Sequence, residues 1–99
     1  MIITVADNIT PSSDKFNNSG HAVAYLAKFY HVVDVVDLEG NAGLAVGYYI
    51  LNRTKDKEDY NPPEILIKQE CNPDNIAKFQ KIISDITKHM AKKYNRKFV

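Results

Sequence analysis

Hydrophobic and polar positions along this chain fall into blocks that predict short strands, two helices and long polar loops. Residues 1–6 form a β-branched apolar run that is typical of a strand. Residues 7–20 are polar and rich in Asn, Ser and Asp, which indicates a long loop. Residues 20–30 then place apolar side chains at helical spacing, and Ser19 is the predicted N-cap of that helix.

The centre of the chain is apolar on both faces. Residues 32–38 begin with four valines among five residues, which favours an interior strand. The helical period also continues through residues 31–36, so a longer first helix is the alternative. Residues 44–51 are again apolar on both faces, and the turn-forming residues between the two runs predict a β-hairpin. Residues 65–67 form a shorter run with charged ends, typical of an edge strand.

The last block predicts a long amphipathic helix. Asn72 is its expected cap, Pro73 suits the first turn, and Asp74 lies where the helix dipole favours an anion. Apolar residues then recur every three or four positions, with Ile82 at the edge of the stripe. The stripe consists of Ile76, Phe79, Ile83, Ile86 and Met90.

Together these blocks predict one α+β domain over residues 1–99, in the order β-α-β-β-β-α. We expect a mostly antiparallel four-stranded sheet with two helices, of which the C-terminal one is long. Two helices cover little more than one sheet face, yet the central strands are apolar on both. The sequence therefore predicts that a second copy of the chain, or a target protein, covers the other face.

Composition and charge indicate a cytoplasmic protein. The chain shows no secretory leader and no apolar stretch of the ~20 residues that a membrane span needs. Its single cysteine, Cys71, cannot form an internal disulfide, which fits a reducing compartment. We therefore expect no membrane association.

The net charge of +1 hides an uneven distribution. Residues 78–99 carry seven Lys or Arg and one acid, whereas residues 1–77 carry six Lys or Arg and eleven acids. A Lys-rich face on a solvated helix explains such a segment, and so does contact with an anionic partner. Residues 78–97 are therefore a candidate nucleic-acid surface. The candidate contacts are Lys88, Lys92, Lys93, Arg96 and Lys97.

A second candidate site lies at the start of the first helix. Asn18, Ser19 and His21 could form a small nucleotide pocket, because the N–H groups at a helix start bind anions. In that pocket His21 would act as acid or base in phosphodiester chemistry. A solvated or capping histidine is the simpler interpretation. No histidine and cysteine spacing typical of zinc is present, and no glycine-rich phosphate loop, so we expect no metal and no cofactor.

Tyrosines supply the third group of candidates, because exposed tyrosines suit protein interfaces. In a strand over residues 44–51, Tyr48 and Tyr49 point to opposite faces, so one of them would lie on the uncovered face. With Val33 and Val35 they form the predicted protein interface. The sequence shows no convincing catalytic set. It thus predicts a small non-enzymatic binding protein of the inhibitor or adaptor type, acting by surface occlusion as a homodimer, with nucleic-acid or nucleotide binding as the alternative.

Overall fold

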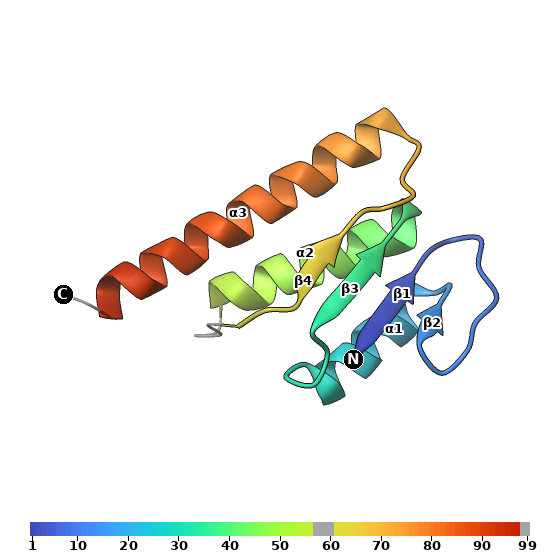
Figure 1. The fold of residues 1–99 in the computed structure, drawn as a ribbon, viewed down its shortest axis with the longest axis horizontal. Helices are drawn as coiled ribbons and strands as arrows, with labels where there is room; N and C mark the ends of the chain where they lie inside the picture. Colours follow the sequence, from blue (N-terminus) through green and yellow to red (C-terminus); the bar gives the residue numbers. More distant parts are fainter. Residues whose placement is uncertain (57–60, 98–99) are drawn as a thin grey trace.

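The computed structural model describes residues 1–56 and 61–97, and within α3 it describes side chains as far as residue 91. Four strands and three helices follow one another along this part of the chain (Figure 1). In chain order they are β1 (Ile2–Val5), β2 (Lys15–Phe16), α1 (Ser19–Phe29), β3 (Val35–Leu38), α2 (Gly40–Asp56), β4 (Glu64–Leu66) and α3 (Pro73–Lys97).

The four strands form one sheet in the order β2-β1-β3-β4, and every pairing is parallel. Ile3 pairs with Val36, which pairs with Ile65, so these three side chains share one face of the sheet. One residue further along each strand, Thr4 of β1 pairs with Asp37 of β3, which pairs with Leu66 of β4, and these side chains lie on the opposite face. Each parallel pair needs a crossover connection. Helices α1 and α2 supply the crossovers that precede β3 and β4.

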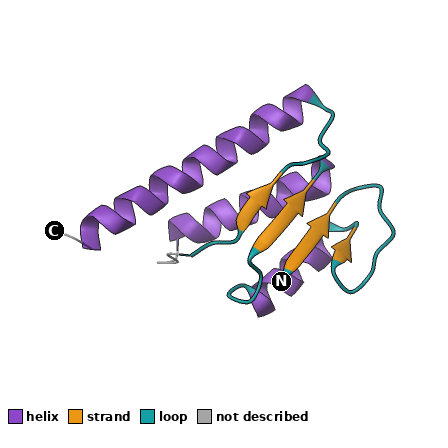
Figure 2. Cartoon of the chain, in the orientation of Figure 1, coloured by secondary structure: helices purple, strands orange, loops and turns teal. Residues whose placement is uncertain are grey.

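Helices cover one face of the sheet only. α1 and α2 lie side by side behind the strands in Figures 1 and 2, and α3 packs against α2 beyond the β4 edge. No helix of the described chain lies over the other face, which is turned toward the viewer. Parallel sheets are usually covered on both faces. We call this uncovered surface, made by Ile2, Thr4, Lys15, Val35, Asp37, Glu64 and Leu66, the open face.

The core lies between the strands and the helices. Ile3, Val5, Val36 and Leu38 project from the two central strands into it and are fully buried. α1 contributes Leu26, α2 contributes Val46 and Ile50, and α3 contributes Phe79 and Ile82. Burial of side chains of this size stabilises a fold by about 1.5–3 kcal/mol each.

The C-terminal helix is confirmed, with its start where the sequence predicts it. The Asn72 side chain accepts a hydrogen bond from the Asp74 N–H at 2.9 Å, which caps the first turn. The stripe is rotated slightly from the prediction, because Ile82 is buried whereas Ile83 is only half-buried. Although α3 has 25 residues, none of the helices that the structure describes is long and apolar enough to cross a membrane.

The predicted β-hairpin is wrong. Residues 44–51 belong to helix α2, not to a strand. Gly43 and Gly47 lie one turn apart on the packed face of α2, and neither marks a bulge. A Cβ atom at Gly43 would lie 3.0 Å from the backbone carbon of Leu38, and one at Gly47 would lie 3.3 Å from Cδ1 of Ile82. These glycines let the helix approach its neighbours closely, so the apolar run reflects a helix that is buried along most of its length.

Three further expectations need correction. The sheet is parallel rather than mostly antiparallel, because a helix, not a turn, connects β3 to β4. The predicted loop of residues 7–20 contains the short strand β2, which restores the count of four strands. The N-cap of α1 is Asn18 rather than Ser19, since its side chain accepts a hydrogen bond from the His21 N–H at 3.1 Å. α1 ends at Phe29, so the first helix does not continue through residues 31–36.

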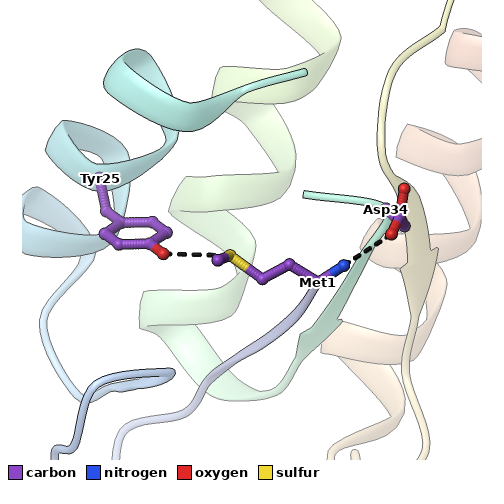
Figure 3. Close-up of polar contacts among 3 residues, drawn as sticks. All are labelled: Met1, Tyr25 and Asp34. Atoms are coloured by element: carbon purple, nitrogen blue, oxygen red, sulfur yellow. Dashed lines mark hydrogen bonds and ion pairs between the residues drawn. The ribbon is translucent and has the colours of Figure 1, made fainter. Parts of the chain in front are cut away.

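The amino end of the sheet is fixed by polar contacts of Met1 (Figure 3). Its ammonium group lies 2.6 Å from a carboxylate oxygen of Asp34, and its sulfur accepts a hydrogen bond from the Tyr25 hydroxyl at 3.0 Å. The Met1 carbonyl accepts from the Asp34 N–H at 2.8 Å. These contacts tie β1 to α1 and to the residue before β3. They also account for an aspartate among valines, because Asp34 is exposed as well as paired.

Candidate functional site

Because all strands are parallel, their carboxyl ends meet at one edge of the sheet, and all three helices begin there. Asp7 follows β1 by two residues, Glu39 directly follows β3, and Glu70 lies four residues beyond β4. The chain leaves β1 toward β2 on one side and leaves β3 toward β4 on the other. Ligands of open α/β sheets bind in the crevice that such diverging connections leave.

Asp7 closes the amino end of α2. Its two carboxylate oxygens accept hydrogen bonds from the N–H groups of Asn41 and Ala42, at 2.8 and 2.9 Å. A carboxylate here satisfies N–H groups that have no partner within the helix, and it is favoured by the helix dipole. Asp7 therefore joins the end of β1 to the start of α2.

Glu70 joins the starts of two helices. One of its carboxylate oxygens accepts from the Gly40 N–H at 2.7 Å, and the other accepts from the Asn72 N–H at 2.9 Å. Burial raises the pKa of this carboxyl, but hydrogen bonds from Asn72, Gly40, Asn75 and Cys71 outweigh it and lower the pKa below its ordinary value. Glu70 is thus held as the ionised form.

Gly40 makes room for this arrangement. It has φ +70°, a conformation that other residues adopt at a cost, and it is the one such residue in the part of the chain that the structure describes. A Cβ atom there would lie only 2.3 Å from an Asp7 carboxylate oxygen. The Asp7 carboxylate can approach the start of α2 because this position lacks a side chain.

A polar cleft of about 500 Å³ opens at this edge, and we call it the carboxyl-edge cleft. It is lined by Ala6, Asp7, Asn8, Ile9, Glu39, Gly40, Asn41, Gln69, Glu70, Cys71, Asn72 and Asn75. Its charged side chains are all acidic. Asp7 and Glu70 are occupied by backbone N–H groups, but the half-buried Glu39 carboxylate forms no hydrogen bond or ion pair with any residue of the described chain.

A second depression, of about 450 Å³, continues from the cleft onto the open face. The two share Ile9, Glu39 and Gln69, and the second adds Thr4, Thr10, Lys15 and Asp37. Asp37 is half-buried, and its carboxylate also has no hydrogen-bond or ion-pair partner among the described residues. Glu39 therefore lies where two polar hollows meet.

The predicted nucleotide-pocket residues lie at the same edge of the sheet, because α1 begins just beyond the carboxyl end of β2. Asn18 already accepts a hydrogen bond from the His21 backbone, Ser19 is half-buried, and the His21 side chain is exposed. None of the three lines the carboxyl-edge cleft. Their proposed part in nucleotide binding stays a prediction.

The four predicted interface residues do not share one surface. Val35 is half-buried on the open face, whereas Val33 is buried in the core. Tyr48 is exposed on α2, and Tyr49, also on α2, is half-buried and accepts a hydrogen bond from Arg53 at 3.1 Å. α2 packs on the face of the sheet opposite to Val35. The prediction that the two tyrosines lie on opposite faces of a strand is therefore wrong, because both belong to helix α2.

Of the predicted nucleic-acid contacts, Lys88 is exposed on α3. Lys92, Lys93, Arg96 and Lys97 continue the same helix, but their side chains lie outside the described residues. The basic surface therefore stays a prediction.

Sequence reasoning did not select Asp7, Glu39 or Glu70 as site residues. One feature of the sequence could have indicated them: each of these acids follows one of the apolar runs, at its end or a few residues beyond it. In an antiparallel sheet these acids would lie at opposite edges. The pattern therefore predicts a shared site only if the strands are known to be parallel.

Comparison of the chain with protein-family models, curated proteins and solved structures found no match among any of them. Within the described chain, no three His, Cys, Asp or Glu side chains are placed to hold a metal ion together. The geometry of the cleft is therefore the basis for a functional proposal.

Proposed function

We propose that this protein binds a small polar ligand carrying a positive charge in the carboxyl-edge cleft. The observation that carries the proposal is the half-buried Glu39 carboxylate, which has no partner within the described chain and lies at the carboxyl edge of a parallel sheet. Clefts of about 300–1,000 Å³ with a few convergent polar groups are the usual form of small-molecule sites. This one has the size and the position of such a site.

The charge of the cleft favours a cation over a phosphate. In many α/β proteins the N–H groups at a helix start bind a phosphate. Here Asp7 and Glu70 already occupy the N–H groups of Gly40, Asn41 and Ala42. Two carboxylates at that position repel an added anion. An ammonium or guanidinium group can instead pair with Glu39, and the amide side chains of Asn8, Asn41 and Gln69 can bond its polar neighbours.

The proposal is tested by titrating isotopically labelled protein with agmatine, a small guanidinium cation, and following the backbone amide resonances. We expect shifts confined to residues 6–10, 39–41 and 69–75. Glu39→Gln should weaken the interaction about tenfold or more, because a hydrogen bond to a charged group contributes about 1.5–3 kcal/mol.

Glu64→Gln is the matched control, since it removes the same charge at the amino end of β4, away from the cleft. It should leave agmatine binding unchanged. Glutarate, an anion of similar length, should cause no shifts at these residues. Equal responses to both compounds, or an affinity that Glu39→Gln leaves unchanged, would contradict the proposal.

The two functions expected from the sequence stay predictions. Protein binding by surface occlusion is consistent with the open face, although the residues first expected there do not gather on it. Nucleic-acid binding rests on the basic C-terminal segment. Neither of them uses the Glu39 carboxylate, so the agmatine titration separates the cleft from both.

A further inference from the structure

The open face exposes apolar side chains where a parallel sheet is normally covered. Ile2 is 59% exposed at the centre of this face, and Val35 beside it is half-buried. Parallel strands are buried on both faces in nearly all known folds. This surface is therefore an incomplete layer of the fold.

The charges on the open face have opposite signs at its two sides. Lys15 lies on β2, at one edge of the sheet, and is exposed. Asp37 on β3 and Glu64 on β4 lie toward the other edge. No ion pair joins Lys15 to an acid of the described chain. One copy of the face therefore presents a positive edge and a negative edge, both without partners.

This pattern is self-complementary under twofold symmetry. Two copies stacked face to face about an axis along the strands place β1 of each over β3 of the other, and β2 over β4. Ile2 then lies over Val35 of the other copy, and Thr4 over its Asp37, because each pair shares a register row. Lys15 lies over Leu66 of the other copy, two residues along β4 from Glu64, and its long side chain can extend to that carboxylate. Ile2 thus meets an apolar residue, Asp37 meets the Thr4 hydroxyl, which can donate a hydrogen bond to it, and Lys15 lies near an opposite charge.

We propose that a second copy of this chain covers the open face, with the strands of the two sheets aligned and Lys15 of each copy paired with Glu64 of the other. The strand region is small. Three interstrand steps of about 4.8 Å and three residue steps of about 3.3 Å span roughly 14 by 10 Å. A stable complex buries about 800 Å² on each partner. The dimer is therefore weak, with an expected dissociation constant between about 100 µM and 1 mM.

Sedimentation equilibrium between about 10 µM and 1 mM tests the proposal with three charge variants. Lys15→Glu and Glu64→Lys each reverse one charge at an exposed position, and each should weaken the dimer about threefold or more. Each change acts twice in a symmetric pair, and a surface ion pair contributes up to about 1 kcal/mol. The double variant Lys15→Glu/Glu64→Lys should restore association to within about twofold of the original chain.

Far-UV circular dichroism confirms that each variant keeps its fold, and Lys78→Glu on α3 is the control for a general charge effect. The control should associate as the original chain does. A chain that remains monomeric at 1 mM overturns the proposal. A dimer that the single reversals leave unchanged, or that the double reversal does not restore, also overturns it, since another surface then forms the contact. Glu64→Lys and Lys78→Glu change no residue that lines either polar hollow, so agmatine binding is compared in these two variants and not in Lys15→Glu.

Discussion

Two carboxylates, Asp7 and Glu70, occupy the position where many α/β proteins bind a phosphate. Together they accept from the first three N–H groups of α2 and from the Asn72 N–H at the start of α3. The protein thus supplies its own anions at this position, and Gly40 provides the space for the Asp7 carboxylate. Glu39, one residue earlier, is left without such a partner among the described residues. Of the three acids at this edge, Asp7 and Glu70 therefore stabilise the helix starts, and Glu39 is available to a ligand.

Glu70 should make the stability of the protein sensitive to acid. Its pKa in the folded protein lies below the ordinary value of 4.5. Its contribution is therefore fully present above about pH 5 and is lost as the pH falls through the lower folded pKa. Glu70→Gln should destabilise the protein by about 1 kcal/mol at pH 7. Urea denaturation from pH 7 to pH 3 should show that difference shrinking toward low pH. A constant difference would show that ionisation of Glu70 contributes nothing.

At the scale of single elements, the sequence predicts α3 and β3 but misses α2, because α2 is largely buried. α3 was predictable because its stripe and its Asn72 cap agree, and the valines before Leu38 correctly indicate β3. α2 was missed because it is buried along much of its length, so polar residues do not interrupt its apolar run. Glycines also favour turns over helices in a sequence pattern, whereas Gly43 and Gly47 let α2 pack closely against Leu38 and Ile82.

The register of α3 can be tested with two neighbouring isoleucines. Ile82 is 1% exposed, whereas Ile83 is only half-buried. Ile82→Ala should therefore destabilise the protein by about 2–5 kcal/mol, because it opens a cavity against α2. Ile83→Ala removes the same atoms and should cost less than half as much. Chemical denaturation measures both changes. Equal losses, or a larger loss at Ile83, would restore the stripe that the sequence predicts.

At the scale of the whole molecule, strand direction decides where the functional groups lie. The same acids after the same strands form one cleft when the strands are parallel, and would be scattered if the sheet were antiparallel. Local patterns predict each strand by itself but carry little information on its direction. The candidate cleft was therefore out of reach of the sequence. No helix of the described chain lies over the second sheet face, but the expectation rested partly on a strand over residues 44–51, and these residues, Tyr48 and Tyr49 included, belong to α2.

The strand order itself makes a prediction about amide hydrogen exchange within β1. The N–H groups of Thr4 and Ala6 donate to carbonyls of residues 14 and 16, at 2.9 and 3.0 Å. Successive N–H groups of a strand point to opposite sides, so Ile3 and Val5 direct theirs toward β3. β2 has only two residues and is an edge strand, so it should open locally at little cost, whereas β3 is held between two strands.

Thr4 and Ala6 should therefore exchange about tenfold or more faster than Ile3 and Val5, although all four amides are hydrogen-bonded in the sheet. Exchange of each amide in deuterated buffer, followed by NMR, measures the alternation. Ala6 is the informative residue, because its side chain is only 2% exposed and burial by itself would predict slow exchange. Equal protection on the two sides of β1 would mean that β2 is as firmly paired as β3. Slow exchange at Thr4 and Ala6 with fast exchange at Ile3 and Val5 would contradict the prediction, because the pairing of β1 with β3 would then open more easily than its pairing with β2.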